Sequence, residues 1–188
     1  QKCIFENNES EDFLNLIHSK YELNDSYFKS VKSDAVDSDY SNGTITNSIF
    51  TDIGNDAMDF SGSISELSDI RIDGVGDKVL SAGEKSKISG KHIDIINAEI
   101  GITSKDLSEV DLSNVKIKDT RLGFAVFQKK EEYGASKAKI TGLEMTNVEV
   151  IHLVELNSTL TLNGKDVINK RPKVENFLYG ANFGKSSK

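Results

Sequence analysis

The sequence predicts an all-β fold, a right-handed single-stranded parallel β-helix of about six to seven coils of about 22 residues. One reason is a recurring unit of two apolar residues, a Gly/Asn/Asp turn and a second short apolar strand, as in 49–58, 70–80 and 93–102. Another is that helical periodicity is weak and confined to the N-terminal region. The third is a column of apolar residues at steps of 22 or 23 and a final step of 28: Phe5, Phe28, Phe50, Ile72, Ile95, Ile117 and Met145.

In a β-helix each strand pairs with its counterpart one coil away, so inward side chains stack into ladders of similar residues. The column above is predicted to be one such ladder. Leucine-rich repeats have a similar period, but their fixed pattern of Leu and Asn is absent. A second ladder is predicted from Val36, Met58, Leu80, Ile102, Ala125 and Leu153.

Residues 1–20 are predicted to form a partial first coil or an N-terminal cap. The apolar residues at 13–17 fit either a strand of that coil or a short helix that covers the open end of the stack. Because the core-type pair Ile4 and Phe5 comes so early, we expect the chain to be a fragment of a longer protein. A mature N-terminus is the alternative.

Residues 21–165 are predicted to be the β-helix repeats, beginning with coils at 21–42, 43–63, 64–86 and 87–108. A longer coil at 109–136, a last full coil at 137–158 and a final strand ending in an Asn-Gly turn complete the repeats. Each early coil has a serine at the same place, which indicates a structural column of hydrogen bonds: Ser41, Ser63, Ser86 and Ser108.

Residues 166–188 break the repeat and are predicted to be a C-terminal cap and a frayed tail at 185–188. The apolar residues expected to fold across the C-terminal end are Val174, Phe177, Leu178, Tyr179 and Phe183.

Composition excludes several classes of function. The formal net charge is −7, and no Lys/Arg run alternates with aromatic residues, so nucleic acid is not an expected partner. An acidic surface also disfavours anionic membranes, and no apolar segment approaches the roughly 18 residues of a membrane span. The single cysteine, Cys3, excludes an intramolecular disulfide and a multi-cysteine metal site.

The sequence predicts no cofactor and no metal site. His18, His92 and His152 do not share a repeat column, and calcium would need several converging oxygens. Two pairs of aspartates do occupy equivalent positions in successive coils. Stacked carboxylates repel, so each pair should recruit a cation, a lysine or a shared proton, and Lys32 and Lys78 are the expected neutralisers. The pairs are Asp37 with Asp59 and Asp34 with Asp56.

Two groups of residues are candidates for function. If the chain is an enzyme, the acidic strand face supplies its catalytic groups, because glycosidases need two carboxylates about 5–9.5 Å apart. Those candidates are Asp37, Asp59, Glu84 and Lys105. The insertion at 128–136 maps to a loop on one face of the solenoid, and such loops often bind ligands. Its ligand-binding candidates, with a merely solvated loop as the alternative, are Lys129, Lys130, Glu132 and Tyr133.

About residues 21–165 resemble the right-handed parallel β-helix superfamily, the pectate-lyase-like group with its carbohydrate-binding and sugar-hydrolase repeats. The segments "GNDAMDFSGS", "VGDKVLSAGEKS", "AEIGITSKDLS" and "LGFAVFQKKEEYGAS" look like modules of bacterial envelope or surface-polysaccharide proteins. Lyases of that group use Arg or Lys beside calcium. The Asn-Thr-Asp, Asp-Asp, Gly-His-Gly and Arg-Ile-Lys motifs of polygalacturonases and the Asp-Pro-His motif of mannuronan epimerases are absent, so the resemblance supplies no active site.

These observations together predict a non-catalytic β-helix module of a larger bacterial envelope or surface protein, carbohydrate-binding or scaffolding. Its expected partner is a polysaccharide or a neighbouring domain of the same polypeptide, and its expected location is the bacterial cell surface or the secreted fraction. The alternative is a polysaccharide lyase or glycoside hydrolase whose acidic residues lie on the strand face.

Overall fold

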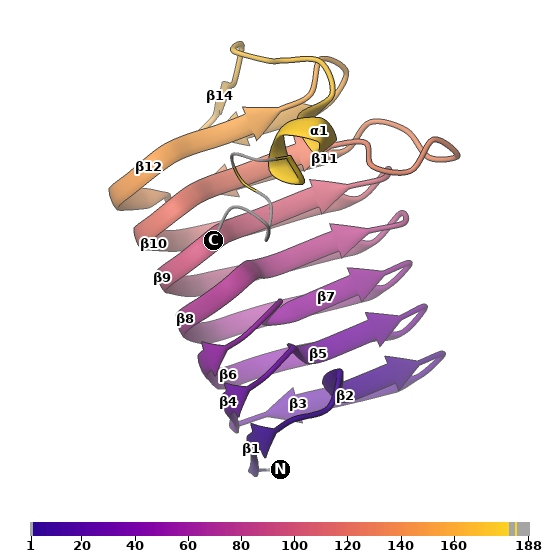
Figure 1. Ribbon diagram of the computed structural model, residues 1–188, viewed down its shortest axis with the longest axis vertical. Helices are drawn as coiled ribbons and strands as arrows, with labels where there is room; N and C mark the ends of the chain where they lie inside the picture. Colours follow the sequence, from indigo (N-terminus) through magenta and orange to yellow (C-terminus); the bar gives the residue numbers. More distant parts are fainter. Residues whose placement is uncertain (1, 181–182, 184–188) are drawn as a thin grey trace.

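The computed structural model describes residues 2–180 and 183. These residues form a parallel β-solenoid of about seven turns, and its coils stack in sequence order from the N-terminus to the C-terminal region (Figure 1). This confirms the predicted fold class. The strands are β1 (Cys3–Asn8), β2 (Asp12–Ile17), β3 (Lys20–Asn24), β4 (Ser26–Val31), β5 (Asp34–Asp39), β6 (Asn42–Ile53), β7 (Met58–Ser61), β8 (Ile64–Gly83), β9 (Lys87–Lys105), β10 (Glu109–Phe127), β11 (Lys137–Thr141), β12 (Glu144–Val154), β13 (Thr159–Leu162) and β14 (Lys165–Asp166), followed by the helix α1 (Val174–Leu178).

Left-handed residues form the bends that close each coil. Their φ angles lie between 47° and 84°, a region that Asn, Asp and Gly enter at the least cost. The abundance of these residues in the sequence therefore reflects the bends as well as the loops. One column of bends contains Asp25, Asn47, Asp69, His92 and Asn114, and a second contains Ser30, Asp52, Gly74, Asn97, Asp119 and Asn147.

The first predicted ladder is confirmed over its whole length. Phe5 pairs with Phe28 and Phe28 with Phe50, and the same register continues through the three isoleucines to Met145. The Phe28 ring lies almost parallel to those of Phe5 and Phe50, with centroids 4.5 and 4.7 Å apart. These rings and the isoleucines after them fill the buried centre of the solenoid.

The second predicted ladder is correct as far as Ile102 and wrong at its last two members. Ile102 pairs with Phe124, not Ala125, so the ladder continues through the buried ring of Phe124. Ala125 and Leu153 pair with each other one position along and belong to a separate apolar cluster on the outside. The slip arose because 124–127 are all apolar, and inward and outward residues cannot then be told apart by alternation.

The serine column is confirmed and is longer than predicted. The backbone N–H groups of Ser41, Ser63 and Ser86 donate to the side-chain oxygen of the serine one coil later, at 2.9, 3.0 and 3.1 Å. Ser19 joins the column at the N-terminal end through Ser41, at 2.8 Å. These buried hydroxyls satisfy backbone donors at a bend where the strand ladder is interrupted.

At the N-terminal end, residues 12–17 form the strand β2, which pairs with β5 in parallel, so the helical alternative is wrong. The rings of Phe5 and Phe13 meet edge to face there, with centroids 5.3 Å apart. The core therefore reaches this end of the stack, where both rings are only partly buried.

The C-terminal segment does two things. β14 pairs with β13 in antiparallel fashion, and the Arg171 backbone continues along the last coil by bonding to Val154 and Leu156. The C-terminal apolar residues were predicted to fold across the end of the solenoid. Instead, the helix α1 lies against its side (Figure 1). The reason is the outward apolar cluster, which the helix covers: Ile100, Leu122, Ala125, Phe127 and Leu153. The predicted frayed tail at 185–188 lies outside the described residues.

Candidate functional site

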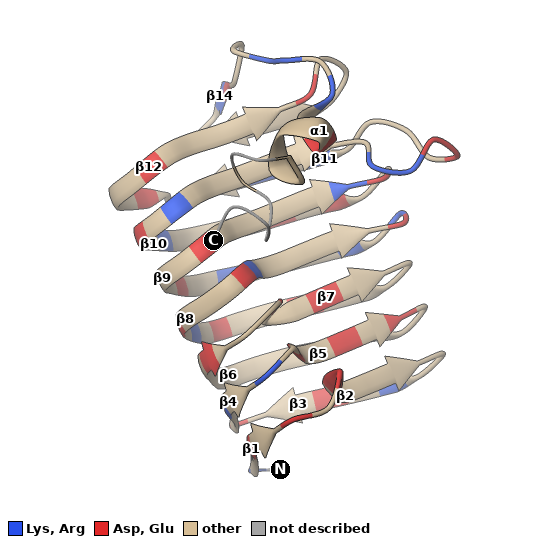
Figure 2. Cartoon of the chain, viewed as in Figure 1, with Lys and Arg blue, Asp and Glu red and all other residues tan. Residues whose placement is uncertain are grey.

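One face of the solenoid changes its character along the axis. It is built from β5, β7 and the C-terminal parts of β8, β9, β10 and β12. Figure 2 shows acidic residues on β5 and β7. They lie on the same side of the solenoid as α1, which covers coils closer to the C-terminal end. One outward column runs through Asn15, Asp37, Asp59, Ser81, Thr103, Ala125 and Leu153, and a second runs through Asp34, Asp56, Lys78, Ile100, Leu122 and Val150.

Another face of the solenoid alternates in charge instead. Arg71, Asp94, Lys116 and Glu144 follow one another in register, and the Lys116 ammonium lies 3.6 Å from the Glu144 carboxylate. On β10 and β11, Lys139 lies 3.4 Å from Asp111 in the same way. Opposite charges one rung apart attract weakly in water, whereas stacked carboxylates repel. The repeated aspartates of β5 and β7 therefore oppose folding.

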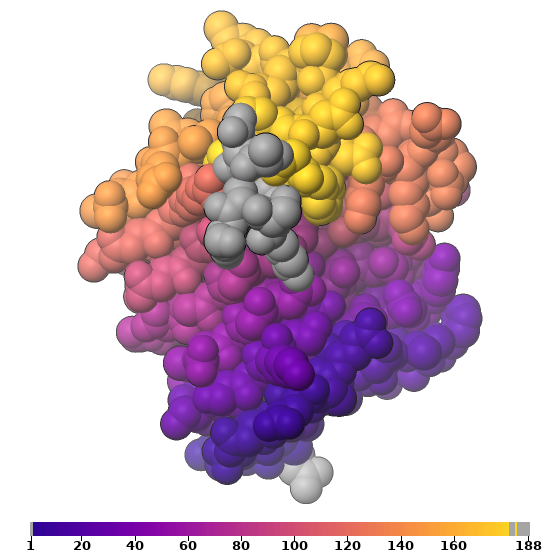
Figure 3. Space-filling model, in the orientation of Figure 1, coloured from indigo at the N-terminus to yellow at the C-terminus, as the bar shows by residue number. Residues whose placement is uncertain are grey.

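A cavity of about 370 Å³ lies where the acidic and apolar halves of this face meet. Its apolar wall comes from Ile100 and from the C-terminal segment, which covers the upper coils in the space-filling view (Figure 3). The opposite wall is charged. The residues that line the cavity are Asn55, Asp56, Asp59, Gly76, Asp77, Lys78, Glu99, Ile100, Lys105, Lys129, Leu178, Tyr179 and Phe183.

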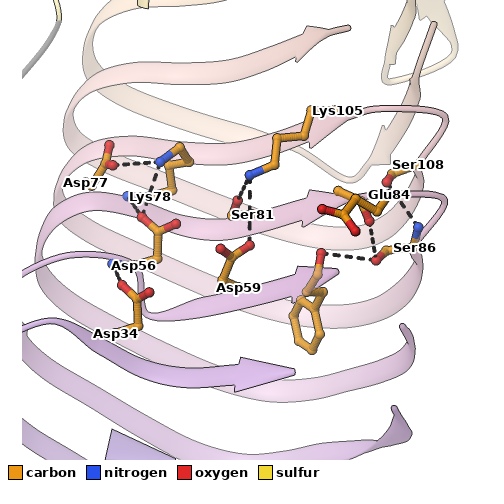
Figure 4. A network of polar contacts seen from close by, with 12 residues as sticks. Asp34, Asp56, Asp59, Asp77, Lys78, Ser81, Glu84, Ser86, Lys105 and Ser108 are labelled. Carbon is orange, nitrogen blue, oxygen red and sulfur yellow. Dashed lines mark hydrogen bonds and ion pairs between the residues drawn. The ribbon is translucent and has the colours of Figure 1, made fainter. Parts of the chain in front are cut away.

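Lys78 neutralises the buried carboxylate of Asp56, as the sequence analysis predicted. Its Nζ lies 3.4 Å from Asp56 Oδ1 and 2.6 Å from Asp77 Oδ2 (Figure 4). Burial raises the pKa of Asp56 to about 7 although Lys78 opposes the shift. Burial disfavours the charge of Lys78 too, but the two carboxylates outweigh it and raise the pKa of the ammonium. Lys32, the other expected neutraliser, is exposed, and none of the ion pairs among the described residues includes it.

Asp37 and Asp59 lie in register one coil apart, as predicted. Burial, followed by the charges of Asp39 and Asp59, raises the pKa of Asp37 to about 7. The Lys105 ammonium donates to Ser81 Oγ at 2.9 Å and lies 4.0 Å from Asp59 Oδ1 (Figure 4). That oxygen is buried, yet it accepts no hydrogen bond from any described residue.

Glu84, the fourth catalytic candidate, lies apart from these groups in the turn after β8. It accepts a hydrogen bond from the Tyr40 hydroxyl at 3.2 Å and another from Lys130. The Lys130 hydrogen bond lowers the pKa of Glu84. The structure thus places Asp59 and Lys105 in the cavity wall, Asp37 one coil away and Glu84 outside the cavity lining.

The loop at 128–136 is held in one shape by buried Asp106. Its Oδ1 accepts the backbone N–H groups of Lys129 and Lys130 at 2.6 and 2.7 Å. Lys129 then reaches the cavity, where its Nζ lies 5.0 Å from the centre of the Tyr179 ring. Burial lowers the pKa of Lys129, and the nearby ammonium groups of Lys105 and Lys78 lower it further.

The other three loop candidates point elsewhere. Lys130 pairs with Glu84, and the Tyr133 ring lies 5.7 Å from the Lys85 ammonium. Glu132 is exposed. Only Lys129, of the four predicted ligand-binding residues, lines the cavity.

Tyr179, Leu178 and Phe183 were predicted to lie across the end of the stack, so their place in this site was missed. The unbroken apolar run at 124–127 could have indicated that this part of the solenoid is covered on its outer side. A strand that is apolar on both faces in a thin solenoid needs a cover on its outer side, and the C-terminal apolar residues were the remaining material for one.

No family model, curated protein or solved structure matches the chain. Among residues 2–180 and 183, no group of three His, Cys, Asp or Glu side chains is arranged to hold a metal ion. The same part of the chain contains no helix with the length and apolar character needed to cross a bilayer.

Proposed function

We propose that this chain is a non-catalytic, carbohydrate-binding β-solenoid module of a larger bacterial envelope or surface protein. The observation that carries the proposal is the cavity of about 370 Å³, with Tyr179 on one wall and a row of charged side chains on the other. Sugars offer hydroxyls that such groups bind and an apolar ring face that a tyrosine covers. The volume of this cavity falls within the range of small-ligand sites.

The electrostatics of the face support a binding role. Burial and the neighbouring carboxylates, Asp59 among them, raise the pKa of Asp37 and the pKa of Asp39. This arrangement therefore opposes folding at neutral pH. Strained or destabilising arrangements of this kind concentrate at functional sites. The charges alternate on the face of Arg71 and Asp94. The same fold therefore accommodates a charge pattern with less repulsion than the stacked aspartates.

The module would also hold its neighbours in place. Rungs that pair in parallel from β1 to β13 make an elongated body, suited to positioning an adjoining domain or a polymer at the bacterial surface.

A polysaccharide lyase or glycoside hydrolase is the second candidate. The observation in its favour is that Asp59 and Lys105 line the cavity, with two further carboxylates, Asp37 and Asp56, whose pKa values of about 7 suit proton transfer. Against it, Lys105 already bonds to Ser81, and Lys78 already pairs with Asp56.

The test is a glycan array with the purified chain, followed by calorimetry on the best ligand. Tyr179→Ala should weaken binding at least tenfold. Tyr27→Ala is the matched control, because Tyr27 lies in the column of Ile49 and Arg71 on a different face, and it should leave binding unchanged. Absence of binding to every glycan overturns the proposal.

Turnover is measured on the same polysaccharides through unsaturated products and new reducing ends. Turnover that Asp59→Ala abolishes without lowering thermal stability would establish the second candidate in place of the first.

A further inference from the structure

Two groups of opposite charge in the cavity are not fully satisfied: Asp59 pairs with Lys105 only at 4.0 Å, and Lys129 has no carboxylate partner among the described residues. Asp59 Oδ1 is buried and accepts no hydrogen bond from the described residues. The Lys129 side chain is half-buried. Its Nζ lies over the Tyr179 ring, 5.0 Å from the ring centre.

The remaining charges that line the cavity are matched within the protein. Lys78 is held by Asp56 and Asp77, and Glu99 pairs with Arg121. Lys105 donates to Ser81 and has Asp59 as its carboxylate partner at 4.0 Å. The unmet requirements are therefore specific: a hydrogen-bond donor for Asp59 Oδ1, to which Lys105 supplies charge only at 4.0 Å, and an anion for Lys129. An amino group meets the first requirement with both a hydrogen bond and a close positive charge. Leaving such groups unpaired in a partly desolvated site costs free energy that a ligand of the right charges recovers.

We infer that the ligand is a zwitterionic saccharide, an inference that rests on the proposed function. It carries a free amino group that faces Asp59 and, on the same or the adjoining sugar, a carboxylate that faces Lys129, while a ring packs on Tyr179. A neutral sugar offers only hydroxyls, which can donate to Asp59 but supply no charge to it and leave Lys129 without an anion. A purely anionic sugar satisfies Lys129 and adds repulsion at Asp59, and a purely cationic sugar does the reverse.

The acidic strands beyond the cavity support the amino group in particular. Asp37 lies one rung from Asp59, about 4.8 Å along the axis. Burial and the neighbouring carboxylates raise its pKa to about 7, so an added positive charge beside this column would stabilise its ionised form. Further amino groups of a longer saccharide would lie along Asp59 and Asp37 toward the N-terminal coils.

The test uses one tetrasaccharide of alternating glucosamine and glucuronate in three forms. The first has free amino groups, the second has the same groups acetylated, and the third has free amino groups and carboxylates reduced to alcohols. Calorimetry at pH 7 and low salt should show the first form binding at least tenfold more tightly than the other two. Equal or tighter binding of either the acetylated or the reduced form overturns the inference.

Two variants assign the charges. Asp59→Asn should weaken binding of the free-amino form at least fivefold and leave the acetylated form unchanged, and Lys129→Gln should abolish the advantage of the carboxylate over the alcohol. The matched controls are Asp111→Asn and Lys139→Gln, the same substitutions in an ion pair on another face, which should change nothing. Equal losses for all three forms would indicate a structural role for Asp59 or Lys129 and contradict the inference.

The outcomes separate the two proposals. Glycans that bind without any preference for charge overturn the zwitterion inference and leave the carbohydrate-binding proposal in place. Failure of every glycan to bind overturns both.

Discussion

The N-terminal and C-terminal halves of one solenoid face share a backbone register but carry opposite kinds of side chain. In the N-terminal half the outward columns are aspartates, and in the C-terminal half the equivalent positions are Ile100, Leu122, Ala125 and Leu153. The apolar half is covered by α1, and the cavity lies at the boundary.

This comparison shows that the repeat specifies the backbone and the core, while the outward positions are free to differ. Inward residues must fill the same narrow space in every coil, so they are similar from rung to rung. The chemistry of outward residues depends on what contacts them, which is solvent, a ligand or another segment of the chain. A change of outward chemistry along one face is therefore evidence of a change in what covers it.

The largest effect should come from removing the cation at the boundary. Lys78→Met leaves the carboxylate of Asp56 buried without its partner, which should lower the free energy of unfolding by about 3–5 kcal/mol at pH 8. The loss should be smaller at pH 5, because the raised pKa of Asp56 then allows the carboxyl group to be neutral. Urea unfolding at the two pH values measures both quantities.

The control is the double variant Lys78→Met with Asp56→Asn. The asparagine keeps an acceptor for the Lys78 backbone N–H, which bonds Asp56 Oδ1 at 2.9 Å, but carries no charge. It should recover most of the lost stability at pH 8. A single Lys78→Met variant as stable as the parent chain would show that the boundary does not depend on this ion pair.

A smaller effect should follow from weakening the cover. Leu178→Ala removes a buried side chain that packs on the outward cluster, at a cost of about 2–4 kcal/mol to the docking of α1. A helix of five residues has no stability of its own, so 174–178 should lose protection in hydrogen exchange while the coils keep theirs. Ile168→Ala, at a residue that is 92 % exposed, should have no effect. Loss of protection throughout the solenoid would show that the cover and the coils unfold as one unit.

Much of the fold could be predicted because a core ladder is a periodic constraint. Phe28, Phe50 and Ile72 are fixed by steps of one coil, a spacing that over many repeats is typical of a solenoid. The prediction slipped at Ala125 because its neighbours Phe124 and Val126 are also apolar. Periodicity identifies inward positions only where outward positions are polar.

The site was harder to predict, because part of its lining comes from segments that do not repeat. The register of Asp37 and Asp59 followed from the repeat. The place of Tyr179 did not, since the chain after 165 has no counterpart in other coils. Lys129 and Lys130 are adjacent in sequence, yet one lines the cavity and the other pairs with Glu84, a difference set by the loop that Asp106 holds.

The smallest effect should come from the charge of the acidic half of this face. It tests most directly how the two halves differ. Asp37 has a pKa of about 7 in the folded chain and about 3.9 when unfolded. Between these values the folded state holds a proton that the unfolded state has released, so stability should fall as the pH rises from about 4 to 7. Asp37→Asn removes this loss and should raise the free energy of unfolding at pH 8 by about 1–2 kcal/mol, a figure reduced for the partial exposure of the side chain.

The matched substitution on the alternating face separates this effect from a general loss of charge. Asp111 lies 3.4 Å from Lys139 and is well exposed, so Asp111→Asn should change the free energy of unfolding by less than about 0.5 kcal/mol at pH 8. Urea unfolding of both variants at pH 5 and pH 8, at one ionic strength, makes the comparison. If Asp37→Asn proves no more stable than the parent chain at pH 8, the aspartates of β5 are not under electrostatic strain, and the argument that places a ligand beside them fails with it.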